Sequence, residues 1–233
     1  MCGRFAQTKE LSILISRFHF IVEDIELRSR YNIAPGQDVA ALVFENNARR
    51  LKIMRWGLVP SWSKDKPSGV KRINARAENL ASKPSFRHCL RKKRCLIPAD
   101  GYYEWKKLPD GKTRIPYHIA LENREPFAFA GLWDSWKNPD GVTLESFTII
   151  TTKANELSSG IHDRMPAILT PESEDAWLDP AITGRDDLLP LLAPYPSEKM
   201  IAFEVSSLVN SPRNDTPECI RKSIAPRQGS LFD

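Results

Sequence analysis

A cysteine directly follows the first methionine of this 233-residue chain. Once Met1 is removed, Cys2 presents an α-amine and a thiol on adjacent carbons. An α-amine has a reference pKa of about 7.7–8.0, against about 10.4 for lysine, so part of it is a free nucleophile at neutral pH. If this amine forms an imine with an aldehyde, the thiol can close a five-membered thiazolidine, which no internal cysteine or lysine can form. Position alone favours an unreactive cysteine at a frayed terminus, so this chemistry needs support from other residues.

Three other segments carry polar side chains that could give this support. An extended backbone at 72–78 would put Asn74 and Arg76 on one face, where the amide can orient an amine and the guanidinium can bind a phosphate. Glu104 stands among aromatic residues, and burial there would raise its pKa and suit it to proton transfer. His162 is predicted on a turn, next to an acid and a base. Each segment also has a purely structural interpretation, as a solvated strand edge, an exposed glutamate or a structural histidine.

Aromatic and basic side chains occur together in two further stretches. Trp62, on a loop rich in proline and serine, could stack on an unpaired base, a contact worth about 1–3 kcal/mol. Trp56, at the end of a predicted strand, is expected in the core. The basic run at 87–94 could follow a phosphate backbone, although such runs are usually a solvated helix end.

The elements that must position these residues are mostly strands. Helical spacing predicts helices over 11–18, with Thr8 as its cap, over 86–91, from Thr170-Pro171 onwards and over 185–192. Short β-branched and aromatic segments predict strands over 39–44, 51–56, 94–98, 114–121, 126–133, 146–152 and 200–205. Two Pro-Asp-Gly turns, at 109–111 and 139–141, predict hairpins. We therefore expect one α+β domain with a barrel-like antiparallel β core and peripheral helices, followed by a tail.

The composition fits a single folded domain. Hydrophobic residues make up 41% of the chain and charged residues 27%, which excludes global disorder. No apolar run approaches the roughly 18 residues of a membrane span, and no secretory signal pattern is found, so a cytoplasmic protein with mostly buried thiols is expected. The net charge of +5 permits a polyanionic partner without proving one. The four cysteines have no zinc-ligand spacing, and we expect neither a metal nor another cofactor.

Seven short motifs follow one another along the chain: MCGRF (1–5), RYNIAPG (30–36), WGLVPSW (56–62), NARAE (74–78), DGYYEW (100–105), IHDRMP (161–166) and VNSPRND (209–215). In this order they resemble the motifs of the SRAP family, the SOS response-associated peptidases, a family understood as abasic-site processing proteins. The resemblance covers about residues 2–222. It implies a compact α+β fold with a barrel-like antiparallel core, and a SRAP domain over 1–222.

The resemblance also implies an activity, which is covalent crosslinking to an abasic site in single-stranded DNA. The α-amine of Cys2 would attack the aldehyde of the ring-opened sugar, and its thiol would close the thiazolidine. Asn74 would position the nucleophile, while Glu104 and His162 would transfer protons during ring opening, imine formation and reversal. An AP lyase activity is compatible with this chemistry. The family name records another activity, a peptidase in which the same cysteine and glutamate remove the initiator methionine.

The DNA-binding residues follow from the same resemblance. Arg4, Arg76 and Arg164 would hold flanking phosphates, and Asn32, Pro35 and Trp62 would line the groove and help to splay the strand. The expected partner is single-stranded DNA, with a preference for junctions where it meets duplex. An abasic nucleotide is already unstacked and costs least to expose, so we expect binding that tolerates any sequence and weakens with salt.

The segment 223–233 looks unattached to any element and forms a separate, flexible tail. Gln228, Leu231 and Phe232 resemble the Gln-x-Ser/Asp-Leu-Phe peptide with which bacterial proteins bind the replication sliding clamp. Two adjacent apolar residues on a flexible segment suit a groove-binding peptide. A chance pentapeptide on a disordered end is the alternative.

Three functions remain open at this point. The leading hypothesis is a DNA-repair enzyme, expected as a monomer, that shields abasic sites through Cys2. The first alternative is a cysteine peptidase that acts on its own N-terminus or on other proteins. The second is a noncatalytic single-strand binding module in which Cys2 is incidental.

Overall fold

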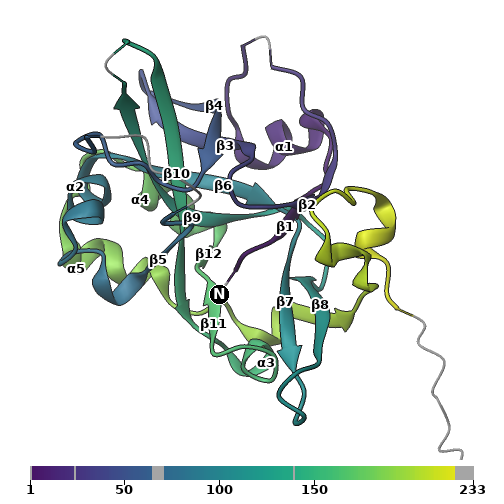
Figure 1. The fold of residues 1–233 in the computed structure, drawn as a ribbon. Coiled ribbons are helices and arrows are strands. Elements are labelled where there is room, and N and C mark those ends of the chain that lie inside the picture. Colours follow the sequence, from purple (N-terminus) through teal and green to yellow (C-terminus); the bar gives the residue numbers. More distant parts are fainter. Residues whose placement is uncertain (1, 24, 65–70, 139, 224–233) are drawn as a thin grey trace, which may run out of the picture.

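The computed structural model describes residues 2–23, 25–64, 71–138 and 140–223. At its centre, five strands close into a barrel, each paired with the next and the last with the first (Figure 1). In barrel order they are β10 (Thr143–Lys153), β4 (Ala48–Trp56), β3 (Asp38–Glu45), β6 (Arg94–Ala99) and β9 (Phe127–Lys137). Closure removes the exposed strand edges that an open sheet would leave. The predicted α+β fold with a barrel-like core is confirmed, with one difference, which is that β10 runs parallel to β4.

Three short strands lie beside barrel strands, and two of them carry candidate residues. They are β5 (Asn74–Arg76), parallel to β10, β11 (Arg164–Pro166), antiparallel to β10, and β12 (Ile168–Leu169), antiparallel to β9. Thr151 of β10 is level with Arg76 on one side and with Pro166 on the other. The strand that begins at Asn74 and the strand that follows His162 therefore flank the same stretch of β10.

A second sheet of five strands packs beside the barrel. Its order is β13 (Met200–Glu204), β8 (Arg114–Leu121), β7 (Gly101–Lys107), β1 (Phe5–Gln7) and β2 (Arg30–Ile33), with all neighbours antiparallel. The predicted turn at 109–111 joins β7 to β8, and Gly111 has a φ of +72°, which favours glycine. The predicted turn at 139–141 lies between β9 and β10, whose ends pair at Lys137 and Thr143, although Pro139 itself is outside the described residues.

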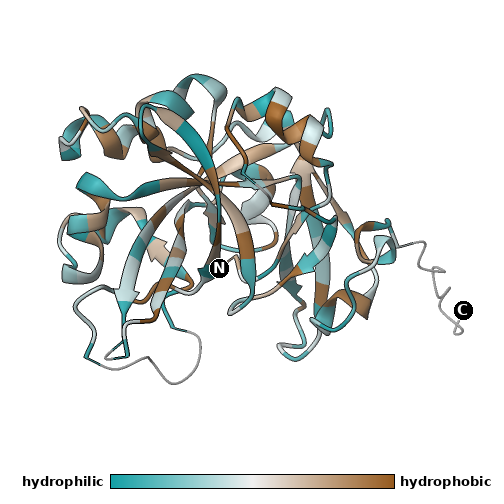
Figure 2. Cartoon of the chain, turned by 90° about the horizontal axis from the view of Figure 1, so that it is seen from above, coloured by the Kyte–Doolittle hydropathy of each residue, from teal (hydrophilic) through white to brown (hydrophobic). Residues whose placement is uncertain are grey.

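Helices surround the strands, and their apolar sides face the middle of the molecule, where apolar stretches gather in Figure 2. In the described ranges they are α1 (Leu11–Phe18), α2 (Pro84–Lys92), α3 (Glu156–Ser159), α4 (Pro171–Leu178) and α5 (Arg185–Leu188), with 3-10 turns η1 (Ala77–Asn79), η2 (Leu189–Leu192), η3 (Ser197–Lys199), η4 (Ser207–Asn210) and η5 (Pro217–Ile220). None of these helices is long and apolar enough to cross a membrane.

The predicted helix caps fare differently. Thr170 caps α4 as expected, because its side chain accepts a hydrogen bond from the amide of Ser173. The prediction for Thr8 is wrong, since its hydroxyl and amide both bond to the carboxylate of Asp100, and the first helix begins after Glu10 without a side-chain cap. Thr8 instead joins the end of β1 to Asp100, just before β7, which is a tertiary contact that the local sequence pattern does not predict.

Phe5 fixes the first strand to the barrel. Its ring is fully buried and lies edge-on to Trp56, at 5.1 Å between centroids, and to Phe129, at 5.7 Å. Trp56 is itself fully buried, as predicted. Burying a phenylalanine side chain contributes about 1.5–3 kcal/mol, so β1 is held against the barrel three residues after Cys2.

The segment 209–215 is fastened to β2 by one carboxylate. Asp215 accepts hydrogen bonds from the backbone amides of Tyr31 (2.6 Å) and Asn32 (2.9 Å), and it forms an ion pair with Arg30 at 2.5 Å. Hydrogen bonds to charged groups contribute about 1.5–3 kcal/mol each when they are lost from a buried site. The seventh sequence motif, at 209–215, therefore has a structural role, because Asp215 binds it to β2 of the second sheet.

Replacing Asp215 by alanine should destabilise the protein by about 2–4 kcal/mol, because two backbone amides and a guanidinium lose their acceptor together. Urea unfolding at neutral pH, followed by circular dichroism, measures this change. Asp110→Ala is the matched control, because that carboxylate lies on an exposed turn and bonds only to the neighbouring Lys112 and Thr113. An equal loss of unfolding free energy in the two variants would contradict this structural role of Asp215.

Candidate active site

Cys2 is completely buried just before β1, an inner strand of the second sheet. Its thiol lies 3.9 Å from the backbone carbonyl of Arg4, to which it donates a weak hydrogen bond. Burial raises the pKa of the Cys2 thiol far above its usual value, and the nearby charge of Glu104 raises it further. The sulfur is therefore a neutral thiol at physiological pH, unlike the thiolates of cysteine peptidases. All four cysteines are buried, and none forms a disulfide within the described residues.

Glu104 lies near Cys2 because β7 pairs with β1. Phe5 of β1 lies opposite Tyr102 of β7, and the carbonyl of Arg4 accepts a hydrogen bond from the amide of Tyr103 at 2.9 Å. One further step along this antiparallel register puts Glu104 beside Gly3, next to Cys2. Its side chain is only 4% exposed, and burial raises the pKa of the Glu104 carboxyl. Glu104 is therefore buried and its pKa is raised, as the sequence predicted.

Asn74, at the start of β5, binds Cys2 directly. Its amide nitrogen donates a 2.7 Å hydrogen bond to the carbonyl oxygen of Cys2. Its amide oxygen is buried and has no hydrogen-bond partner in the described part of the chain. A buried acceptor without a donor is costly, and this one lies beside the residue whose amine would be freed by removal of Met1.

His162 lies in the turn between α3 and β11, with its side chain 29% exposed. Its Nδ1 accepts a hydrogen bond from the amide of Arg164 at 3.0 Å, and an oxygen of Asp163 lies 2.8 Å from the same nitrogen. The amide contact requires a lone pair on Nδ1, so the neutral ring carries its proton on Nε2; a protonated ring would instead donate to Asp163. The imidazole is close enough to Glu104 for its charge to oppose the effect of burial on the pKa of that carboxyl.

Two members of this cluster were missed by sequence reasoning. The hydroxyl of Tyr102 lies 3.1 Å from that of Ser158 in α3, and both side chains are buried. Burial raises the pKa of Tyr102, and the nearby Glu104 carboxylate adds to this effect. The strand period could have found Tyr102, because residues two apart on a strand share a face with one another, as Tyr102 and Glu104 do.

Three of the predicted DNA-binding residues are accessible. Trp62 is 61% exposed on its loop, Arg76 is exposed at the end of β5, and Pro35 is half-buried. Their accessibility is compatible with a groove, and their contact with DNA stays a prediction.

Arg4 and Asn32 are used inside the protein. The Asn32 side chain has no exposed surface, and its amide donates to the carbonyls of Ser211 (3.0 Å) and Asn214 (2.6 Å). Arg4 donates to the side-chain oxygen of Asn32 at 2.8 Å and to the carbonyl of Val209 at 2.6 Å. In this structure, Asn32 joins β2 to the segment 211–214, and its contact with DNA stays a prediction.

Arg164 is held by Glu78. Its guanidinium forms a two-pronged ion pair with the Glu78 carboxylate, at 2.6 and 3.0 Å, and donates to the carbonyl of Thr151 at 2.6 Å. This ion pair lowers the pKa of Glu78. Because the backbone amide of Arg164 also bonds to His162, the pair links η1 to the turn that carries the histidine.

The candidate active site thus brings together Cys2, Asn74, Glu104 and His162 from four separate motifs. Among the residues that the structure describes, no group of three histidine, cysteine, aspartate or glutamate side chains could hold a metal ion. The chemistry that this cluster offers is an amine and thiol on one residue, with a carboxyl and an imidazole to transfer protons.

Comparison with known proteins identifies the family. A sequence model of the family described as SOS response associated peptidase (SRAP) matches residues 1–212. This chain belongs to the SRAP family. Over 222 residues it is 50% identical to "Abasic site processing protein YoqW" of Bacillus subtilis, covering 94% of this chain and 99% of that protein. Over 198 residues it is 40% identical to "Abasic site processing protein HMCES" of Gallus gallus, covering 76% of this chain and 58% of that protein.

A solved structure has the same fold. A protein from Bacteroides thetaiotaomicron superimposes with a TM-score of 0.86 at 29% identity, covering 96% of this chain and all of that one. The family and the α+β fold class predicted from the sequence are therefore confirmed.

Proposed function

We propose that this protein processes abasic sites in single-stranded DNA by forming a covalent thiazolidine link through Cys2. The observation that carries the proposal is the hydrogen bond from Asn74 to the carbonyl of Cys2, which orients that residue beside Glu104 and His162. Relatives named as abasic site processing proteins support the choice of substrate.

The reaction has two bond-forming steps after Met1 is removed. The α-amine of Cys2 adds to the aldehyde carbon of the ring-opened sugar, and the resulting carbinolamine loses water to give an imine. The thiol then adds across the carbon–nitrogen double bond, so that sulfur binds the carbon and the thiol proton ends on nitrogen. The sum is aldehyde plus aminothiol giving thiazolidine plus one water.

The surrounding side chains supply the proton transfers that these steps need. Asn74 has a free amide oxygen that can accept a hydrogen from the new α-amine and aim its lone pair at the sugar. Glu104, whose pKa is raised by burial, can give a proton to the leaving hydroxyl and take one from the thiol. His162, with its proton on Nε2, can assist opening of the sugar ring.

Exposed Trp62 and Arg76 suit a strand whose damaged nucleotide is out of the stack. Trp62 offers a face on which a flanking base can stack, and Arg76 can bind a phosphate. Neither contact reads base identity, so binding is expected to tolerate sequence and to weaken with salt.

The direct experiment mixes the Met1-processed protein with an abasic oligonucleotide and with an intact oligonucleotide of the same sequence. A band that survives denaturing electrophoresis is expected with the abasic strand only. Intact mass of the adduct should equal protein plus DNA minus one water. A noncovalent complex with both strands and no surviving band would identify a binding module instead.

A peptidase acting on other proteins is disfavoured by the state of the thiol. Such enzymes use a thiolate, and burial raises the pKa of Cys2 so that the thiol stays protonated. Removal of Met1 by the protein itself is a separate reaction, because it cleaves the Met1–Cys2 peptide bond within one molecule and needs no second protein as substrate. Intact mass of purified Glu104→Ala tests it, since retention of Met1 is the expected result of self-cleavage that uses this carboxyl.

Glu78→Gln should strengthen binding of single-stranded DNA several-fold at low salt. The substitution removes a negative charge that occupies the Arg164 guanidinium, leaving it able to bind a phosphate. The slope of log K against log salt should steepen by about 0.7, the value for one more phosphate contact on a single strand. Fluorescence anisotropy with intact DNA measures both quantities. Glu45→Gln is the control, as that carboxylate pairs with Lys52 on the barrel.

A clamp-binding role rests on the peptide that contains Gln228, Leu231 and Phe232, which lies outside the described residues. We propose the bacterial sliding clamp as its partner. A synthetic peptide of residues 224–233 should bind the clamp, and the double change Leu231→Ala and Phe232→Ala should abolish that binding.

A further inference from the structure

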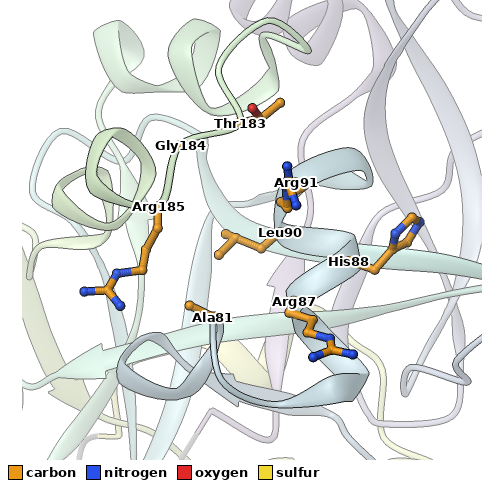
Figure 3. A pocket seen from close by; sticks show the side chains of 8 residues that line it. All are labelled: Ala81, Arg87, His88, Leu90, Arg91, Thr183, Gly184 and Arg185. Atoms are coloured by element: carbon orange, nitrogen blue, oxygen red, sulfur yellow. The ribbon is translucent and has the colours of Figure 1, made fainter.

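A cavity of about 540 Å³ opens between α2 and the segment 183–185 (Figure 3). Ala81 and Leu90 form apolar parts of its wall, and Leu90 is 2% exposed. Arg87, Arg91 and Arg185 stand around it, as Figure 3 shows. The hollow has an apolar floor and cationic edges, which is the make-up of a site for an anionic ligand with an apolar part.

Two of these arginines have no side-chain partner among the described residues. The side chains of Arg87 and Arg91 are exposed, and neither forms an ion pair or hydrogen bond with any described residue. They are four residues apart on one helix, where like charges repel and cost about 0.2–0.5 kcal/mol. Arg185 differs, because it lies 3.4 Å from the carboxylate of Asp186. The free cationic charge at the cavity therefore comes from α2.

The cavity continues towards Trp62. A second hollow of about 310 Å³ is lined by Trp62 and Asp134, and it shares Arg87 and His88 with the first. The carboxylate of Asp134 is already used, since it accepts from Lys93 at 2.7 Å and from the amide of Ser61 at 2.7 Å. A continuous surface thus runs from the exposed indole to Arg91 with unpaired positive charge along it.

The other end of this surface is connected to the candidate active site through the chain. Arg76, at the end of β5, is five residues before Ala81 in the cavity wall, and η1 lies between them. One short segment of the chain therefore joins Arg76 to the cavity wall.

We infer that the surface formed by Trp62, Arg87 and Arg91, here named the α2 track, binds phosphodiester groups of the nucleic acid that extends beyond the lesion. Arginine forks match phosphate oxygens, and the apolar wall accommodates sugar or base edges without reading sequence. The inference rests on the proposed function for its choice of polyanion. The same chemistry is presented by a single-stranded arm and by a duplex arm, and the experiment distinguishes them.

The test compares Arg87→Gln/Arg91→Gln with a control of equal charge loss, Arg114→Gln/Arg221→Gln. The control residues are exposed and lie on the side of β8 and the C-terminal segment, away from α2 in Figure 1. Noncovalent affinity is measured on intact DNA of three kinds: a single strand of roughly 5 nucleotides, a single strand of roughly 20, and the short strand with a duplex arm. Because no lesion is present, failure of the crosslinking chemistry does not affect this readout.

The α2-track variant should bind one or both of the longer DNAs about 10-fold more weakly at low salt. Its salt slope should fall by about 1.4 for a single-stranded arm or about 1.8 for a duplex arm, the values for two phosphate contacts. The short strand should bind as tightly to this variant as to the unchanged protein. A loss confined to one arm identifies which arm the track holds.

Three results would overturn the inference. The first is an unchanged affinity for both longer DNAs. The second is an equal loss of affinity in the control variant, which would mean that only net charge matters. The third is an equal loss of affinity for the short strand. If crosslinking fails while the α2-track variant still shows the arm-specific loss, the proposed chemistry is wrong and the track stands.

Discussion

Cys2→Ser should lose the denaturant-resistant DNA adduct, with its yield falling by roughly 100-fold or more, while keeping an adduct that borohydride traps. Serine preserves the α-amine after removal of Met1, so an imine still forms. The hydroxyl that replaces the thiol is a poorer nucleophile, and the ring it would close reopens readily. Borohydride reduces the imine to a stable amine and so reveals the intermediate. The two adducts together separate the roles of the amine and of the sulfur.

A second cysteine provides the matched control. Cys219 is also fully buried, and its thiol also donates to a backbone carbonyl, that of Asn214 at 3.4 Å. Cys219→Ser should therefore report the general cost of placing a hydroxyl in a buried thiol site, and its adduct yield should match that of the unchanged protein. Full persistence of the denaturant-resistant adduct in Cys2→Ser would contradict the thiazolidine.

Glu104→Gln should slow adduct formation by roughly 100- to 10,000-fold, the range for loss of a general acid–base group. Glutamine keeps the shape of the side chain and one acceptor oxygen, but its NH2 group only donates and it cannot exchange a proton. The pH dependence of the rate assigned to this carboxyl should disappear in the variant, whereas a merely structural role would leave the profile in place. Single-turnover rates across pH 4–9 measure both effects; Glu122→Gln, at an exposed site after β8, is the control.

The same substitution should stabilise the folded protein at neutral pH. Burial raises the pKa of Glu104 above its ordinary 4.5, so the folded state resists ionisation more than the unfolded state does. Below pH 4.5 the carboxyl is neutral in both states and carries no penalty. As pH rises through the raised value the folded protein loses stability, and the loss is complete above it.

Glu104→Gln removes this loss, and its melting temperature should therefore exceed that of the unchanged protein at pH 7. Each kcal/mol relieved corresponds to roughly 2–4 °C for a protein of this size. The two proteins should converge at pH 4. A variant that is both slower and more stable would mark Glu104 as a residue retained for chemistry at the expense of folding.

Local pattern predicted most of the long elements, because their burial follows the strand or helix period. The stretches predicted as strands at 39–44 and 51–56, for example, are β3 and β4, which pair residue by residue. The parallel pairing of β10 with β4 and β5 could not be predicted in this way. These parallel pairs join segments about 75–90 residues apart in the sequence. The sequence of a single strand does not specify which distant strand it will pair with.

The candidate site was predictable as residue types and only partly as positions. Motif resemblance named Cys2, Asn74, Glu104 and His162, and the structure brings them together. The burial of Asn32 was not predictable, because an asparagine side chain suits an exposed groove as well as a buried contact, and its bonds to 211–214 depend on the tertiary fold. Glu78 was quoted within a motif but given no role, since its partner Arg164 is 86 residues away.

The complete burial of Cys2 also limits when Met1 can be removed. An aminopeptidase must reach an extended, accessible chain end, whereas β1 in the finished protein is enclosed between β2 and β7. Its partner β7 ends at Lys107, so on the ribosome the N-terminus stays undocked until about that length of chain has emerged. At about 5–20 residues per second, translation leaves a window of roughly 5–20 s for an external enzyme. An external aminopeptidase would therefore have to act before β7 pairs with β1.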